Sequence, residues 1–131
     1  MRIEVAGIPA PQGSKRHVGG GRMVESSRAV GPWRDDVRTE TQRVMRTHVA
    51  FDGPVAATIT FYLDRPKSTP KRVKYPAKRP DLDKLVRAVL DGLQAGGAFH
   101  DDAQVVRLAA RKVFYGDHDV RGCLIDIETE D

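Results

Sequence analysis

Four aspartates in two short segments are the residues of this chain that are most able to do chemistry. Asp81 and Asp83 are separated by Leu82, and Asp101 and Asp102 are adjacent further along the chain. Carboxylates that lie close together raise one another's pKa unless a cation neutralises their charge. Oxygen ligands of this kind suit a hard ion such as Mg²⁺. The sequence therefore predicts a magnesium site for one or two ions, provided that the fold brings the two pairs together.

Basic residues surround both acidic pairs. They are Lys71, Arg72, Lys74, Lys78 and Arg79 on the upstream side, and Arg107, Arg111 and Lys112 on the downstream side. A basic stretch alone can be a solvated loop, but beside a carboxylate cluster it favours the binding of phosphate groups. A bound Mg²⁺ would lower the pKa of a water and stabilise the leaving oxygen in phosphodiester hydrolysis. This pattern indicates a metal-dependent enzyme that acts on a polyanion.

A helix must position the first acidic pair. Apolar residues recur at helical spacing at Leu82, Leu85, Val86, Val89, Leu90 and Leu93. They predict an amphipathic helix that begins near Leu82 and ends at Gly96–Gly97. Residues two apart on a helix point about 200° away from each other. Asp81 and Asp83 can therefore share a metal only if Asp81 lies at the N-cap, outside the helical conformation.

Simpler roles for these aspartates remain open at this point. Asp81 could be only an N-cap, and Asp83 only a first-turn acid that the helix dipole favours. Asp101 and Asp102 could be turn residues before the next strand. Within the helix, Asp83, Arg87 and Asp91 are spaced to form ion pairs along one face. Arg87 could instead reach the scissile phosphate or orient the acid.

The remaining segments predict an α+β fold. We expect a strand over 2–8, a loop over 9–21, a short strand or hairpin arm over 22–25 and a helix from Pro32 to about His48. A strand over 55–63 follows, then an irregular segment over 64–80. The final strands are expected over 105–115 and 121–128, joined by a turn at Gly116–Asp117. Together they predict a small mixed β-sheet with two main helices packed on it.

Length and composition are consistent with one domain over residues 1–131. The longest apolar runs are far shorter than the ~20 residues of a membrane span, and the N-terminus has no secretory apolar region. Cys123 is the only cysteine and has apolar neighbours, which predicts a buried thiol. We therefore expect a cytoplasmic protein that does not associate with a membrane.

Three segments together resemble the RusA family of Mg²⁺-dependent Holliday junction resolvases, which phages and prophages often encode. They are Arg79-Pro80-Asp81-Leu82-Asp83-Lys84-Leu85, then Leu90-Asp91-Gly92-Leu93, then Phe99-His100-Asp101-Asp102-Ala103-Gln104-Val105-Val106. The strong match extends from Lys78 to Lys112. The N-terminal half is similar only in its order of elements, namely a first strand, a basic turn that contains proline and then a helix. The resemblance implies a small RusA-like domain that forms a homodimer with one active site per subunit.

The resemblance also implies roles for individual residues. Asp81, Asp83 and Asp102 would be metal-binding catalytic acids, and Asp101 a neighbour. Arg87 stands where these resolvases carry an important lysine, and Lys84 stands where asparagine is common; a guanidinium and an ammonium are not interchangeable at a tight site. The expected DNA contacts are Lys15, Arg16, Lys71, Arg72, Lys74, Lys78, Arg79, Lys84 and Lys112. Lys112 could alternatively be an ordinary surface lysine of an edge strand.

The resulting hypothesis is a homodimeric Mg²⁺-dependent endodeoxyribonuclease that resolves four-way (Holliday) junctions in DNA recombination and repair. A twofold protein suits this substrate because resolution requires two symmetric nicks. Two alternatives stay open. The first is a module that binds branched DNA without cutting it. The second is a nuclease that acts on other branched DNA, such as flaps or forks.

Overall fold

The structure is a computed structural model that describes residues 1–13, 15–18, 22–25, 28–116 and 120–131. The side chains of residues 15–18 and 22–25 are not part of this description. Residues 14 and 19–21 of the loop expected over 9–21 lie outside this description, as does Asp117 of the turn expected at Gly116–Asp117.

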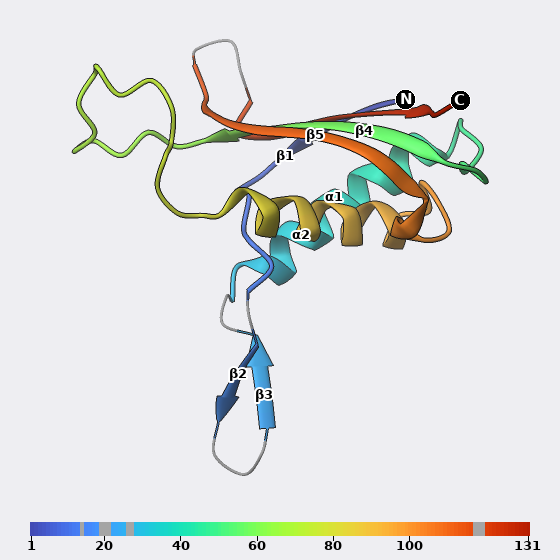
Figure 1. The fold of residues 1–131 in the computed structure, drawn as a ribbon, viewed down its shortest axis with the longest axis horizontal. Helices are drawn as coiled ribbons and strands as arrows, with labels where there is room; N and C mark the ends of the chain where they lie inside the picture. Colours follow the sequence, from blue (N-terminus) through green and yellow to red (C-terminus); the bar gives the residue numbers. More distant parts are fainter. Residues whose placement is uncertain (14, 19–21, 26–27, 117–119) are drawn as a thin grey trace.

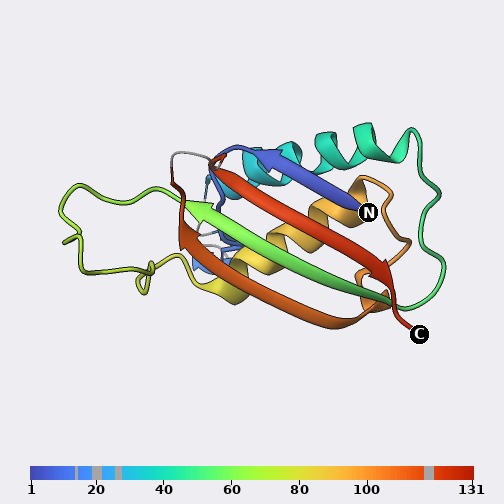
Figure 2. The same ribbon diagram turned by 90° about the horizontal axis from the view of Figure 1, so that it is seen from above.

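A four-stranded mixed sheet forms the centre of the molecule. Its strands are β1 (Arg2–Ala6), β6 (Gly122–Thr129), β4 (Val55–Leu63) and β5 (Val105–Phe114), and they lie side by side in this order (Figure 2). Strands β4 and β5 are parallel, and β6 is antiparallel to both β1 and β4. The predicted mixed sheet is confirmed.

Two helices cover one face of this sheet and leave the other face open (Figures 1 and 2). They are α1 (Val30–Met45) and α2 (Leu82–Ala95). Because α2 lies between the parallel strands β4 and β5 in the chain, it is the crossover that a parallel pair requires. The predicted α+β architecture with two main helices on the sheet is therefore confirmed.

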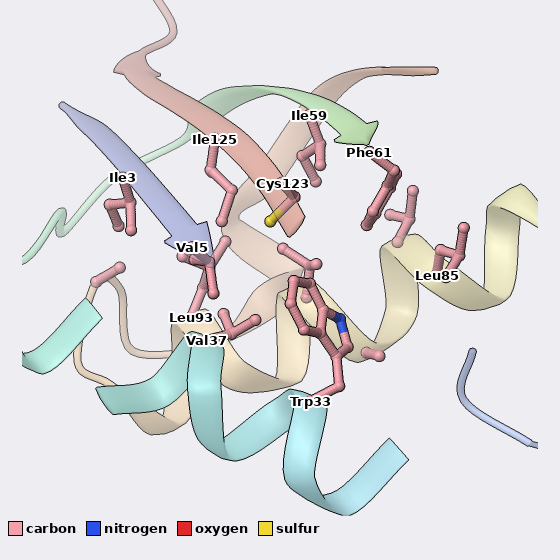
Figure 3. Packing of buried hydrophobic residues seen from close by; sticks show 14 of the residues in the cluster. Ile3, Val5, Trp33, Val37, Ile59, Phe61, Leu85, Leu93, Cys123 and Ile125 are labelled. Atoms are coloured by element: carbon pink, nitrogen blue, oxygen red, sulfur yellow. The ribbon is translucent and has the colours of Figure 1, made fainter. Parts of the chain in front are cut away.

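The core lies between the helices and the sheet (Figure 3). Trp33 and Val37 of α1 and Leu85 and Leu93 of α2 pack against the inward-facing side chains of the strands. Cys123 is buried among them, as expected, and this burial raises the pKa of its thiol. The thiol therefore stays protonated and unreactive.

Two glycines let the helices approach each other closely. A Cβ at Gly92 would lie 2.7 Å from Cβ of Val37, and a Cβ at Gly96 would lie 2.5 Å from Cβ of Thr41. No side chain fits at either position without displacing α1. The short spacing between the helices therefore depends on these two residues, which lie one turn apart on α2.

The element boundaries differ from the sequence predictions in a few places. Helix α1 begins at Val30 and ends at Met45, whereas we expected Pro32 to about His48. The strand β2 (Lys15–Val18) lies within a segment expected to be a loop, and it pairs with the expected β3 (Arg22–Glu25). This hairpin projects away from the helices and sheet (Figure 1). No helix in the described ranges is long and apolar enough to span a membrane.

Candidate metal centre and nuclease site

The start of α2 has the geometry that the acidic pair requires. Asp81 is the N-cap residue, with φ −71° and ψ 135°, so its backbone is extended rather than helical. Its side chain does not cap the helix by a hydrogen bond, and its carboxylate lies 3.8 Å from the Lys84 ammonium. Asp83 lies in the first helical turn. The condition that Asp81 must sit at the cap is confirmed.

The second acidic pair divides into two roles. Asp101 is the N-cap of the short 3₁₀ helix η2 (Asp102–Gln104), and its carboxylate accepts a 2.8 Å hydrogen bond from the Ala103 backbone N–H. Its side chain is therefore used to hold the turn. The Asp102 carboxylate, in contrast, lines a hollow on the surface.

This hollow lies between α2 and β5 and connects the two acidic segments. Its volume is about 510 Å³. The polar side chains that line it are Asp83, Arg87 and Asp102. The other lining residues are apolar: Leu82, Val86, Leu90, Leu108 and Ala110. Asp83 comes from the first turn of α2 and Asp102 from the segment beyond the C-terminal end of that helix, so the hollow follows α2 along its length.

The environment of Asp102 disfavours its charged form relative to that of an ordinary aspartate. Partial burial, a hydrogen bond with Asp101 and the charges of Asp101 and Asp91 all raise the pKa of Asp102, while the positive charge of Arg87 opposes this shift. Excess negative charge at a carboxylate is relieved when a cation binds.

Two glutamines hold the segment around Asp102. The Gln94 side-chain oxygen accepts a 2.9 Å hydrogen bond from the Asp102 backbone N–H, which ties the segment to the end of α2. The Gln104 amide donates to the carbonyls of Phe51 and Gly53, and its oxygen accepts from the backbone N–H groups of His100 and Asp101. Sequence reasoning did not identify either glutamine. The spacing of Asp101 and Gln104 is that of a capping box and could have indicated Gln104, whereas the partner of Gln94 is a backbone group eight residues away.

The donors that line the hollow suit Mg²⁺ in chemical kind. Two carboxylates face one space, and Mg²⁺ is often held by one or two carboxylates with water and phosphate oxygens completing its shell. Asp81 does not line the hollow, and no three His, Cys, Asp or Glu residues of the described part gather closely enough to hold a metal. A shared site of Asp81, Asp83 and Asp102 thus stays a prediction.

Other charged residues near the site have partners. Asp91 pairs with Arg34 of α1 at 3.8 Å, and in the described ranges no ion pair joins it to Arg87, contrary to the ladder considered from the sequence. His100 pairs with Asp52 at 2.8 Å and is a loop residue, as expected. Arg87 has no carboxylate within ion-pair distance among the residues that the structure covers, so its guanidinium remains available to an anion.

The predicted DNA contacts lie in different settings. Lys71, Arg72, Lys74, Lys78 and Arg79 are exposed on the segment between β4 and α2, which extends beyond the sheet (Figure 1). Arg65 orders this segment, since its guanidinium lies 4.4 Å from the centre of the Phe114 ring and donates to the carbonyls of Pro70 and Val73. The side chains of Lys15 and Arg16 on β2 lie outside the described part. DNA contact by these residues stays a prediction.

Comparison with known proteins identifies the family. The family model of endodeoxyribonuclease RusA matches residues 5–125 of the 131 residues, which is nearly the whole chain. No curated protein matches the chain. The matched range contains the two acidic segments, the helix between them, strands β4 and β5, and parts of β1 and β6. The chain therefore belongs to the RusA family of endodeoxyribonucleases, which its acidic segments resemble, and is a structure-specific nuclease.

Proposed function

We propose that this protein is a homodimeric, Mg²⁺-dependent endodeoxyribonuclease that resolves Holliday junctions in DNA recombination and repair, in the cytoplasm. The observation that carries the proposal is the hollow lined by Asp83, Arg87 and Asp102 in a chain that belongs to a nuclease family. The N-cap position of Asp81 supports its inclusion in the acidic set.

Each polar residue of the site has a role that its chemistry suits. Asp83 and Asp102 would hold Mg²⁺, with Asp81 as the third acid. When bound, the ion would supply Lewis-acid stabilisation of the phosphodiester oxygens. Arg87 lies one turn from Asp83, and its free guanidinium can bind two oxygens of a phosphate and fix the orientation of the DNA backbone.

The basic segment of residues 65–79 would position the DNA rather than cut it. Its exposed cations can neutralise backbone phosphates and release counterions, so binding should weaken steeply as salt increases. Two copies of the site related by a twofold axis would match the symmetry of a four-way junction.

The substrate is tested by a panel of synthetic DNA structures incubated with the purified protein and Mg²⁺. The panel contains a four-way junction, a flap, a fork and a linear duplex of the same sequences. We expect the junction to be cut at least about tenfold faster than the linear duplex, by paired symmetric nicks, with no cutting in EDTA.

Three other results of the panel would change the proposal. Faster cutting of flaps or forks would assign the protein to another branched substrate. Tight junction binding without cutting, unchanged in Asp83→Asn, would support a non-catalytic binding module. If the protein is a monomer in solution and cuts only one strand, the proposed paired nicking by a homodimer is wrong.

A further inference from the structure

Lys112 lies on the side of the sheet that faces the helices. In the parallel register of β4 and β5 it is opposite Phe61, which is fully buried. Ala110, two residues earlier on the same strand and therefore on the same face, lines the acidic hollow. Lys112 is thus placed at the end of the hollow where α2 begins.

The ammonium of Lys112 is occupied by the backbone that precedes Asp81. Its Nζ donates to the carbonyl oxygens of Lys78 at 2.6 Å and of Pro80 at 2.7 Å. An ammonium has three donors, so these two bonds leave it little capacity for a phosphate. Hydrogen bonds from a charged donor are shorter and stronger than neutral ones.

The segment that Lys112 holds has few other attachments. Residues 64–80 contain no helix or strand, and their hydrogen bonds at Thr69, Val73 and Ala77 are made within the segment. The bonds from Arg65 also end within it. In the part of the chain that the structure describes, the side-chain hydrogen bonds that join residues 74–80 to the sheet are those of Lys112.

The position of Asp81 follows directly from this attachment. Asp81 is bonded to Pro80, and its carbonyl accepts the first helical hydrogen bond of α2, from the Leu85 N–H. Fixing the Pro80 carbonyl therefore fixes one side of Asp81, and the helix fixes the other side. A misplacement of about 1 Å at a catalytic group can reduce the reaction rate by about a hundredfold.

We propose that Lys112 is a positioning residue, which clamps the backbone of residues 78–80 to β5 and so holds the start of α2, with Asp81 at its cap and Asp83 in its first turn. This role replaces the direct DNA contact predicted from the sequence for this lysine. The expected effect of Lys112 on cleavage rests on the proposed nuclease function, whereas the clamp itself does not depend on that function.

The test compares Lys112→Met with the wild type and with Arg2→Met. The Met side chain keeps much of the length of lysine without its donors. Arg2 is a matched control, because it is a cation on β1, the opposite edge strand, where it pairs with Asp126. Amide hydrogen exchange without metal, junction binding in EDTA and junction cleavage with Mg²⁺ are measured on all three proteins.

The clamp predicts faster amide hydrogen exchange in Lys112→Met at the start of α2, where the Leu85 N–H donates to the Asp81 carbonyl, and no such change in Arg2→Met. Junction affinity in EDTA should stay within about twofold of the wild type, while cleavage slows about tenfold or more. If Lys112→Met does not fold, Lys112→Gln is used with the same readouts, because its shorter side chain cannot reach both carbonyls.

Two results would overturn the proposal. The first is an unchanged exchange rate of the Leu85 amide in Lys112→Met. The second is a loss of cleavage that weaker junction binding explains in full. Lys112 would then be a direct DNA contact, as predicted from the sequence. If the wild type does not cut the junction, the proposed function fails, but the exchange measurement still decides whether Lys112 is a clamp.

Discussion

At the scale of single residues, Asp101 and Asp102 show how adjacent carboxylates acquire different roles. Asp101 accepts a backbone hydrogen bond and caps a short helix, whereas Asp102 lines the hollow with Asp83 and Arg87. We distinguished them in the sequence by the resemblance to the family pattern, although Asp101 and Gln104 also have the spacing of a capping box, which marks Asp101 as the cap. The support from Gln94 could not be predicted, because no local pattern encodes it.

The raised pKa of Asp102 predicts that its charge destabilises the metal-free protein. A carboxyl whose pKa is higher in the folded than in the unfolded state favours folding most when it is protonated, so its ionisation costs stability at neutral pH. In EDTA at neutral pH, Asp102→Asn should therefore melt higher than the wild type, by about 2 °C or less because the site is exposed.

The difference between these two proteins should depend on pH and on metal. The difference should shrink as the pH falls through the raised pKa of Asp102, and it should vanish below the ordinary aspartate value of 3.8, where the carboxyl is protonated in both the folded and the unfolded state. Added Mg²⁺ should raise the melting temperature of the wild type and leave that of the variant nearly unchanged. A wild type that melts higher than Asp102→Asn in EDTA at neutral pH would contradict this interpretation.

At the scale of elements, α2 could be predicted almost completely from the sequence. Its apolar spacing, the cap at Asp81 and the end at Gly96–Gly97 all correspond to the observed helix, and Gly97 adopts φ +88°. The hairpin strand β2 could not be predicted, because Lys15–Val18 is short and has no apolar alternation. The packing of α2 against α1 through Gly92 was also not evident, since a glycine within a helical pattern gives no indication of its partner.

The close approach of the helices predicts a large cost for a small side chain at Gly92. Gly92→Ala would place Cβ 2.7 Å from Val37 and force α1 and α2 apart. We expect a loss of about 1–3 kcal/mol in the free energy of unfolding, despite the higher helix propensity of alanine. Chemical denaturation measures this loss.

Gly31→Ala provides the matched control for this substitution. Gly31 lies in the first turn of α1, and no atom lies within 4 Å of a Cβ built there. Its substitution should be neutral or stabilise the protein by up to about 1 kcal/mol. Equal stabilities of the two alanine variants would show that the helices are not held at this distance in solution.

At the scale of the whole molecule, the strand order explains why residues from distant segments line one hollow. Strands β4 and β5 are parallel and adjacent, so α2 must cross over the sheet between them and its two ends carry the two acidic segments. The mixed sheet with helices on one face could be predicted from the order of elements. The strand order itself could not, because it depends on long-range pairing such as that between β1 and β6.

The distribution of charge also acts at this scale. The net charge is only +4, yet the cations are concentrated on the segment between β4 and α2 while the acids line the neighbouring hollow. Under the proposed function, the basic segment would attract DNA and the acids of the hollow would hold a cation. Of the two adjacent aspartates, we propose that Asp102, and not Asp101, takes part in phosphodiester hydrolysis.

That claim is tested most directly by the single-turnover rate of cleavage of a synthetic four-way junction with Mg²⁺. The wild type is compared with Asp102→Asn and with Asp101→Asn, which keeps a side chain that caps helices well. We predict that Asp102→Asn cuts about a thousandfold more slowly than the wild type. Asp101→Asn should lose less than about tenfold. Equal rates for the two variants, or no cleavage by the wild type, would contradict the account.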